Sequence, residues 1–205
     1  MPATTYPDAG DLQAFLTEIG FSQTVSTESK DSAIAEAVRW VETQTGRVFT
    51  SSHSSEIRKY DNLEVPGRYV VVEIEDAHSI GSVKTGDSAT ALTVVTDYVF
   101  LPRPLRSGQP YEAIKFIAPC PYGINAVTVT GQFGWAAVPE PIKSAVIAYA
   151  AATIISSFNS GSGGVATERK IGDRMVKYAN GMDGVSQLTR DATSAISSYV
   201  RVPYV

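Results

Sequence analysis

Residues 127–153 carry the clearest hydrophobic pattern in the chain. Valine and threonine alternate over the first four positions, which is the two-residue period of a strand with one buried face. Gly131 and Gly134 are expected to end this strand. From Ile142 the period becomes helical, and alanines fill the other sides, so the predicted helix Ile142–Ser157 is apolar nearly all round. The pattern predicts a strand that passes through a Gly-Trp and Pro-Glu-Pro corner into a buried helix.

Three more helices are predicted from apolar residues that recur three or four positions apart, because such residues share one helix face. They are Asp11–Ile19, Asp31–Thr45 and Ser186–Val200. Ser29 is the expected N-cap of the second helix, and Gly46 is expected to end it. A turn over residues 180–184 is expected to precede the last helix.

The segment between residues 47 and 130 contains many short runs of strand-forming residues. The runs are Val48–Phe49, Glu56–Tyr60, Tyr69–Ile74, Ile80–Lys84, Leu92–Val95, Tyr98–Leu101, Ala113–Ile117 and Ile124–Thr130. Short strands at a spacing of about 8–12 residues are typical of a small sandwich or barrel. One further strand is expected at Glu168–Tyr178.

The order of these elements predicts an α+β fold, namely a bundle of about four helices with an inserted small β-sandwich or barrel-like module. We expect N-terminal helices in residues 1–50 and the β-rich module in 51–135. Residues 136–185 are expected to hold the central helix, a flexible Gly/Ser loop at Gly161–Gly164 and a strand. The C-terminal helix and tail occupy 186–205, and the four parts are expected to form one domain overall.

Composition and charge narrow the possible functions. The 205 residues are 43% hydrophobic, which suffices for a folded core, and the net charge of −4 argues against nucleic-acid binding. The longest largely apolar run, residues 145–155, is much shorter than the roughly 20 residues of a membrane span. We therefore expect this helix to be buried in protein and the chain not to enter a membrane.

The sequence offers little for metal or thiol chemistry. Cys120 is the only cysteine, and no activating base lies near it in the sequence, so we expect an inert packed thiol. His53 and His78 are the only histidines, and no metal-ligand spacing links them to each other or to the cysteine. We expect both to be exposed or hydrogen-bonded. No catalytic, metal-binding or cofactor-binding residue is predicted, and no cofactor is expected.

A group of carboxylates has two interpretations. Glu73 and Glu75 are two positions apart on a predicted strand, so they share one face, and Asp76 follows them. Such a pair could supply a general acid and base, as in a cell-wall-degrading enzyme. The same pattern is typical of the solvent face of an edge strand whose Val72 and Ile74 point inward. We favour the second interpretation.

Arginine and aromatic side chains mark candidate contact surfaces, because these residue types are enriched at protein interfaces. Two arginines flank a proline loop, and the C-terminal segment is apolar and aromatic beyond its helix. The candidate subunit-interface or portal-interface residues are Arg103, Arg106, Trp135, Tyr199, Arg201 and Tyr204.

Several stretches, in the right order, resemble motifs of the head–tail connector (adaptor, or head-completion) proteins of long-tailed bacteriophages. Glu42–Phe49 resembles the family's E-x-x-T-G-R-x-F motif, and residues 127–152 resemble its V-T-G-x-x-G-W core. The other resembling stretches are Asp11–Leu16, Thr96–Phe100, Ile171–Asp173 with Tyr178, and the close at Tyr199–Arg201.

The resemblance implies a structural virion protein without enzymatic activity. Such subunits form a ring of about a dozen copies, a dodecamer, below the portal protein at the capsid vertex. The ring bridges the portal to the next neck or tail protein and lets DNA pass without specific binding, which agrees with the acidic net charge. The last helix and the tail would contact the portal. The implied location is the virion neck, assembled in the cytoplasm of a bacterial host. A stopper or tail terminator remains the alternative within the neck.

Overall fold

The computed structural model describes residues 5–50, 52, 54–63, 69–86, 88, 90–102, 108–161, 167–171, 174–178 and 180–202, with side chains described for these residues outside 159–183. The chain forms two compact units. The helical unit contains Thr5–Gly46 and Pro139–Val200, and the sheet unit contains Arg47–Val138 together with Arg201 and Val202. The main segment of the sheet unit, Arg47–Val138, is therefore inserted in sequence between two parts of the helical unit.

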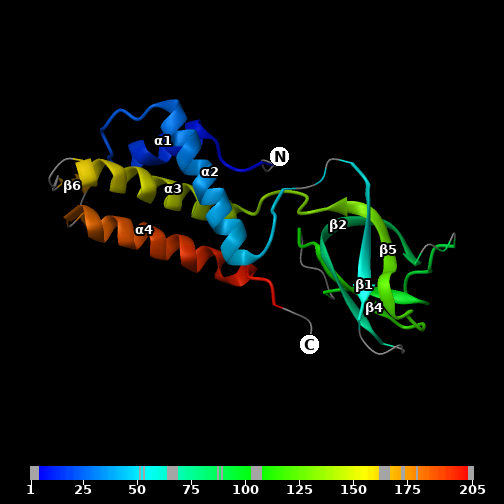
Figure 1. Ribbon diagram of the computed structural model, residues 1–205. Coiled ribbons are helices and arrows are strands. Elements are labelled where there is room, and N and C mark those ends of the chain that lie inside the picture. The colour runs from blue at the N-terminus through cyan, green and yellow to red at the C-terminus, as the bar shows by residue number, and fades with distance from the viewer. Residues whose placement is uncertain are drawn as a thin grey trace. The chain divides into compact units, whose positions relative to one another are not determined.

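Helix α3 is the centre of the helical unit. It lies alongside α2 and α4 and also packs against α1 (Figure 1). The described helices of this unit are α1 (Ala9–Glu18), α2 (Thr27–Thr45), α3 (Glu140–Gly161) and α4 (Asn180–Ile196), followed by the 3-10 turn η1 (Ser197–Tyr199). Two aromatic contacts join them: Trp40 stacks on Tyr149 at 4.4 Å, and Phe21 meets Phe158 edge-on at 5.5 Å.

The apolar character of α3 is explained by its burial. By length and composition, Glu140–Phe158 could cross a membrane. Within the unit, however, Ile142, Val146 and Ala150 are fully buried, and no residue from 145 to 155 is exposed. Helices α1, α2 and α4 pack against α3 and cover these apolar side chains. The expectation of a protein-buried helix is confirmed.

The start of α2 corrects one expectation from the sequence. Ser26, not Ser29, is the N-cap, and its hydroxyl accepts a hydrogen bond from the Ser29 backbone N–H at 3.2 Å. Both serines suit a cap, and the extended backbone of Ser26 (ψ 155°) decides between them. Gly46 ends the helix in the left-handed conformation at φ 65°, as predicted.

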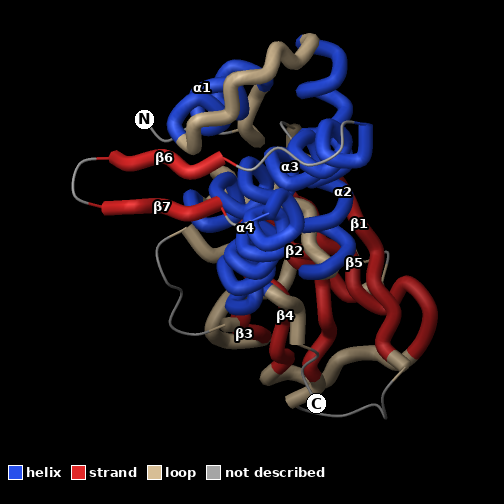
Figure 2. The backbone as a smooth tube through the Cα atoms, turned by 90° about the vertical axis from the view of Figure 1, so that its left-hand side faces the viewer, coloured by secondary structure: helices blue, strands red, loops and turns tan. Residues whose placement is uncertain are grey.

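Two predictions near the C-terminus are wrong. The predicted single strand is a hairpin of β6 (Thr167–Ile171) and β7 (Arg174–Tyr178), which pair antiparallel (Figure 2). A Gly-Asp pair separates the two strands in the sequence, which is a hairpin signal. The predicted turn at 180–184 is instead the first part of α4. The predicted Gly/Ser loop lies outside the described residues, apart from Gly161 at the end of α3.

The sheet unit is built on one open antiparallel sheet with the strand order β1-β5-β2-β4-β3. The strands are β1 (Glu56–Asn62), β2 (Val71–Thr85), β3 (Tyr98–Leu101), β4 (Tyr111–Phe116) and β5 (Gly123–Phe133). The four helices and this five-stranded sheet of the described chain confirm the predicted α+β class. The predicted strands Val48–Phe49 and Leu92–Val95 do not form. Val94 makes only an isolated bridge to Tyr98.

Strand β2 organises the sheet. The sequence predicts two strands here, but Val71–Thr85 is one strand. Its first half, to Ala77, pairs with β4, and its second half, from Ala77, pairs with β5. The register shifts in both ladders next to Ala77, which marks a bulge or a similar irregularity. One strand thus holds both halves of the sheet together.

We expected strand β5 to end at Gly131, but it continues through this glycine to Phe133. A Cβ at Gly131 would lie 2.3 Å from the Ser79 carbonyl oxygen of β2. The glycine therefore permits close strand contact here and does not break the strand. The inner faces of these strands form the core of the unit. Its fully buried members include Ile74, Val83, Ile114, Phe116, Val127, Val129 and Phe133.

Candidate functional site

A buried ion cluster begins at Arg47, the first residue after the C-cap of α2. Its guanidinium Nη1 lies 2.7 Å from Asp76 Oδ1 in β2, and its Nη2 lies 2.9 Å from Glu112 Oε1 in β4. The three side chains are only 7%, 6% and 11% exposed. One cation is thus enclosed by two carboxylates inside the sheet unit.

Trp135, near the C-terminal end of the segment Arg47–Val138, belongs to the same cluster. Its indole Nε1 donates a hydrogen bond to Asp76 Oδ2 at 2.9 Å. The neighbouring Gly134 N–H donates to the Asp76 backbone carbonyl. The Trp135 ring also packs on Phe49, with ring centroids 5.3 Å apart. The start and the end of the inserted segment therefore meet at one aspartate.

The two-residue period of β2 places one carboxylate on its inner face. Burial alternates along the strand at Val72, Ile74 and Asp76, and then Ala77 is buried as well. Two consecutive inward residues break the two-residue period, as expected where the register with β4 shifts between Glu73 and Ala77. Asp76 thus shares the inner face of Val72 and Ile74, where Arg47 and Trp135 bind its carboxylate.

The chemistry of this cluster is that of a structural connection. Arg47 is permanently charged and cannot transfer a proton. Both oxygens of Asp76 accept from neighbours, so neither is directed at a substrate position. Buried ion pairs of this kind are costly to break, because removal of one partner leaves the other charged and unpaired. The cluster can hold chain segments in place.

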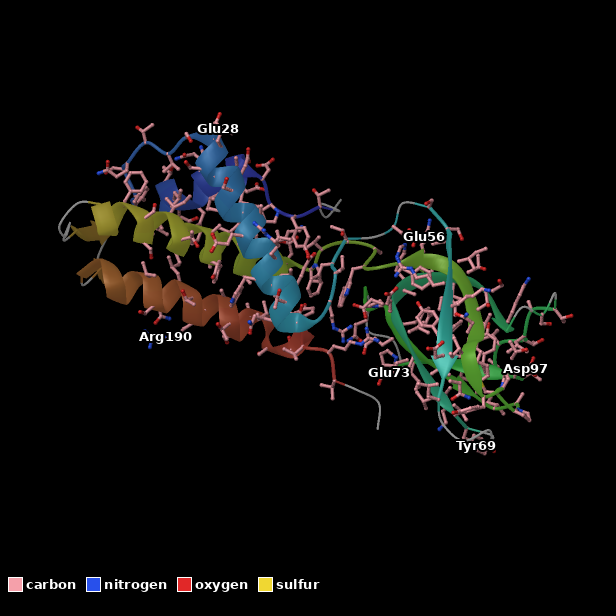
Figure 3. The ribbon with its side chains drawn as sticks, viewed as in Figure 1. Glu28, Glu56, Tyr69, Glu73, Asp97 and Arg190 are labelled. Atoms are coloured by element: carbon pink, nitrogen blue, oxygen red, sulfur yellow. The ribbon has the colours of Figure 1, made fainter. Side chains whose placement is uncertain are left out.

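The predicted carboxylate pair does not form an acid–base site. Glu73 and Glu75 are exposed on the outer face, while Val72 and Ile74 are buried, as predicted. Figure 3 shows Glu73 at the surface of the sheet unit. The prediction of an edge strand is wrong, because β2 lies between β5 and β4.

Glu75 belongs to a surface cluster centred on Arg58. Arg58 forms ion pairs with Glu75 and, at 2.8 Å, with Glu56. Its guanidinium carbon also lies 4.1 Å from the centroid of the Phe133 ring, in cation–π geometry. The glutamate of the proposed acid–base pair therefore already has an arginine partner.

The candidate interface residues occupy different surroundings. Trp135 is 4% exposed and lies in the buried cluster. Tyr199 is half-buried, and burial raises the pKa of its phenol. Arg201 donates a hydrogen bond to the Ile74 carbonyl of β2. The sheet unit thus brings Trp135 and Arg201 to the same part of one strand. Arg103, Arg106 and Tyr204 lie outside the described residues.

Sequence reasoning missed three residues of the cluster, namely Arg47, Asp76 as a buried group, and Glu112. A signal existed for Arg47, because it is the arginine of the E-x-x-T-G-R-x-F stretch. An arginine in this position, directly after a helix-ending glycine, is often exposed to solvent. The motif alone therefore does not indicate that Arg47 is buried or which residues it binds. The two-residue period of the strand places Asp76 on the face of Val72 and Ile74, opposite Glu73 and Glu75, but it does not indicate which residues the carboxylate binds.

The thiol and the described histidine behave as predicted. Cys120 is 1% exposed, and burial raises the pKa of its thiol to about 11, so it is inert near neutral pH. The Nε2 of His78 lies within hydrogen-bonding distance (3.1 Å) of Gln132 Oε1. His53 lies outside the described residues. Within the described part of the chain, no group of three histidine, cysteine or acidic side chains could hold a metal ion.

No protein-family model and no curated protein sequence matches the chain. Solved structures do match in fold. A chain in the neck of an empty GTA particle, computed with C6 symmetry, is 12% identical with a TM-score of 0.51, and the match covers 100% of this chain and 95% of that one. A chain in the neck of a native GTA particle, computed with C12 symmetry, is 13% identical with a TM-score of 0.45, covering 100% and 96%. GTA denotes a gene transfer agent. The first match shows that this chain has, over its whole length, the fold of a chain in a gene transfer agent neck.

Proposed function

We propose that this chain is a non-enzymatic structural subunit of the neck of a phage-like particle, in the role of the head–tail connector, or adaptor. The observation that carries the proposal is the fold match to the neck chain. It extends over 100% of this chain and 95% of the other, so it includes the helical unit, the sheet unit and the connections between them. The motifs that resemble phage connectors point to the same role independently.

The surface of the sheet unit supports assembly with other chains. Large apolar side chains are exposed there: Ile57 is 69% exposed, Leu63 69%, Tyr69 63%, Tyr122 60% and Ile124 78%. Burial of such apolar side chains against a partner protein favours association. A closed ring uses two different complementary surfaces on each subunit, so exposed apolar residues are expected on a free subunit.

In this proposal about twelve copies form a ring below the portal protein, and the next neck or tail protein binds the opposite side. DNA passes through the ring without specific binding. The net charge of −4 supports passage, because a bore that neutralised many phosphates would retain the DNA. The ring is part of the virion and assembles in the cytoplasm of the host bacterium.

The test is to mix the purified chain with the portal protein of the same particle. Analytical ultracentrifugation and negative-stain images should show the portal ring with an added ring of this chain. A chain that stays monomeric at high concentration and never joins the portal contradicts the proposal. If the chain does not bind the portal but binds the end of tail tubes, it is a tail terminator. If it binds an adaptor ring instead, it is a stopper.

The C-terminal segment provides a sharper test of the portal contact. Arg201 binds the Ile74 carbonyl, so a deletion that includes it would disturb the sheet unit itself. Deletion of residues 202–205 leaves that bond in place and removes Val202, which is 71% exposed. We expect weaker portal binding with an unchanged unfolding midpoint. Unchanged portal binding would show that the tail does not form this contact.

A further inference from the structure

Strand β1 lies at one edge of the open sheet. It pairs with β5 on one side, and no described strand follows it in the sheet order on the other side. The opposite edge strand, β3, has only four residues and is followed by Pro102, which has no backbone N–H to donate. β1 has seven residues and contains neither proline nor glycine. It therefore presents the longer backbone edge, and such an edge pairs readily with a further strand.

The exposed side chains of β1 and the residue after it follow a self-complementary pattern. Every second position is exposed, and these positions are Ile57, Lys59, Asp61 and Leu63. Ile57 and Leu63 are each 69% exposed. The ladder irregularity at the end of β1 adds residues in β5 and not in β1, so the alternation continues along β1. The exposed order is apolar, positive, negative, apolar.

Two β1 strands that run antiparallel match this order when Tyr60 lies on the twofold axis. Lys59 of each copy then lies opposite Asp61 of the other, and Ile57 lies opposite Leu63. Opposite charges and apolar side chains at directly opposed positions stabilise an antiparallel pair. Asp61 uses one carboxylate oxygen for a backbone N–H of β5, and its second oxygen can accept from a lysine.

Other registers of the same pair are less favourable. A pair centred on Lys59 or on Arg58 places two like charges directly opposite each other, which is destabilising. A pair centred on Ile57 places Leu63 opposite a residue that precedes β1, so this apolar side chain stays exposed. The charges and the apolar residues thus favour the register centred on Tyr60.

We propose that the chain forms a twofold dimer in which the β1 edges of two copies pair antiparallel about Tyr60. A twofold contact uses the same surface on both copies, whereas neighbours in a ring use two different surfaces. The dimer is therefore a form of the chain outside the proposed ring. It covers an open edge that would otherwise favour aggregation. This inference stands whether or not the chain belongs to a neck.

Disulfide cross-linking of the full-length protein tests the register. In a Cys120→Ala background, one preparation carries Lys59→Cys and another carries Asp61→Cys. In a mixed dimer the two cysteines lie directly opposite each other, about 4.5–5.5 Å apart, and the second Lys–Asp pair stays intact. Two copies of the same variant place their cysteines diagonally, about 7–8 Å apart, which is too far for an unstrained disulfide. We expect about tenfold more cross-linked dimer in the mixture than in either variant alone.

The matched control for cross-linking mixes Ile57→Cys with Asp61→Cys. These positions are diagonal in the proposed register, so this mixture should give as little cross-linked dimer as the single variants. Equal cross-linking in both mixtures, or none in the first, would overturn the proposed pairing.

Charge reversal tests whether this edge holds the dimer together. Lys59→Glu or Asp61→Lys alone places like charges opposite each other and should weaken dimerisation about tenfold. A mixture of the two variants restores two pairs of opposite charge and should form mixed dimers with nearly native affinity in analytical ultracentrifugation. Arg39→Glu, the same kind of charge change on α2, is the control and should leave the dimer unchanged. A native chain that stays monomeric at high concentration, or one whose self-association does not respond to Lys59→Glu, overturns the proposal.

Discussion

The indole nitrogen of Trp135 donates a hydrogen bond of 2.9 Å to the carboxylate of Asp76, across 59 positions of sequence. The other oxygen of that carboxylate accepts from Arg47, 29 positions before it. Asp76 therefore links the first and the last part of the inserted sheet segment, and it does so in a buried place where each lost partner is costly.

Substitutions in this cluster should destabilise the sheet unit in a graded way. Trp135→Phe keeps the ring packing on Phe49 but removes the N–H, which should cost about 1–3 kcal/mol in unfolding free energy. Asp76→Ala leaves the Arg47 guanidinium with an incomplete set of partners and should cost about 3–5 kcal/mol. Urea unfolding of the full-length chain measures both effects.

The control for these variants is Glu75→Gln. Glu75 is largely exposed, and surface ion pairs such as its pair with Arg58 contribute about 0–1 kcal/mol. An Asp76→Ala variant that is no less stable than Glu75→Gln would contradict the assignment of the buried cluster as a structural connection.

Gly131→Ala should destabilise the chain, because the new Cβ would lie 2.3 Å from the Ser79 carbonyl oxygen and would push β2 and β5 apart. Overpacking of this kind costs about 1–3 kcal/mol. Gly81→Ala is a matched control on the facing strand, where the nearest atom to a new Cβ is the Thr130 carbonyl oxygen at 3.6 Å. Thermal unfolding should separate the two variants clearly. Equal midpoints would show that the strands are not this close.

Removing the N-cap of α2 should weaken the helical unit. Ser26→Ala loses the acceptor of the Ser29 N–H and should cost about 1 kcal/mol, within the usual range of 0.5–2. Ser29→Ala keeps that cap and loses only an exposed hydroxyl contact, so its effect should be smaller. The comparison by denaturant unfolding checks the position of the cap directly. A larger effect for Ser29→Ala would place the cap where the sequence alone suggested it.

Cys120 should make stability fall at alkaline pH. Burial raises the pKa of its thiol from 9.0 to about 11, so the folded state favours the neutral form. This contribution is fully present below pH 9 and is lost as the pH rises towards 11, because only the unfolded thiol ionises in that range. Unfolding free energy measured from pH 8 to 11 should decline, and Cys120→Ala should reduce the slope. Rapid reaction of the native thiol with an alkylating reagent at pH 8 would argue against its burial.

Local rules give a good account of the elements. The helical periodicity around Leu12, the helix-ending Gly46 and the alternation at Val127–Thr130 depend on a few adjacent residues, and each appears in the structure. The errors occur where two local signals compete. Ser26 and Ser29 are both suitable N-cap residues for α2. In β2, a few residues with low strand propensity make the sequence look like two strands, although the structure has one continuous strand that pairs with β4 and β5. A glycine such as Gly131 is a local signal for the end of a strand. In the structure it instead lets β5 continue at close distance to the backbone of β2.

The sequence by itself therefore determines the α+β class, the buried α3, the inert thiol and the outward-facing Glu73 and Glu75, because these follow from short-range periodicity and residue chemistry. Only the tertiary structure decides that Arg47, Asp76 and Trp135 meet. Their bonds span 29 and 59 positions, and they join residues that lie before β1, in β2 and after β5. The physical reason is that such a contact is set by strand pairing across the whole unit, which no local stretch of residues encodes.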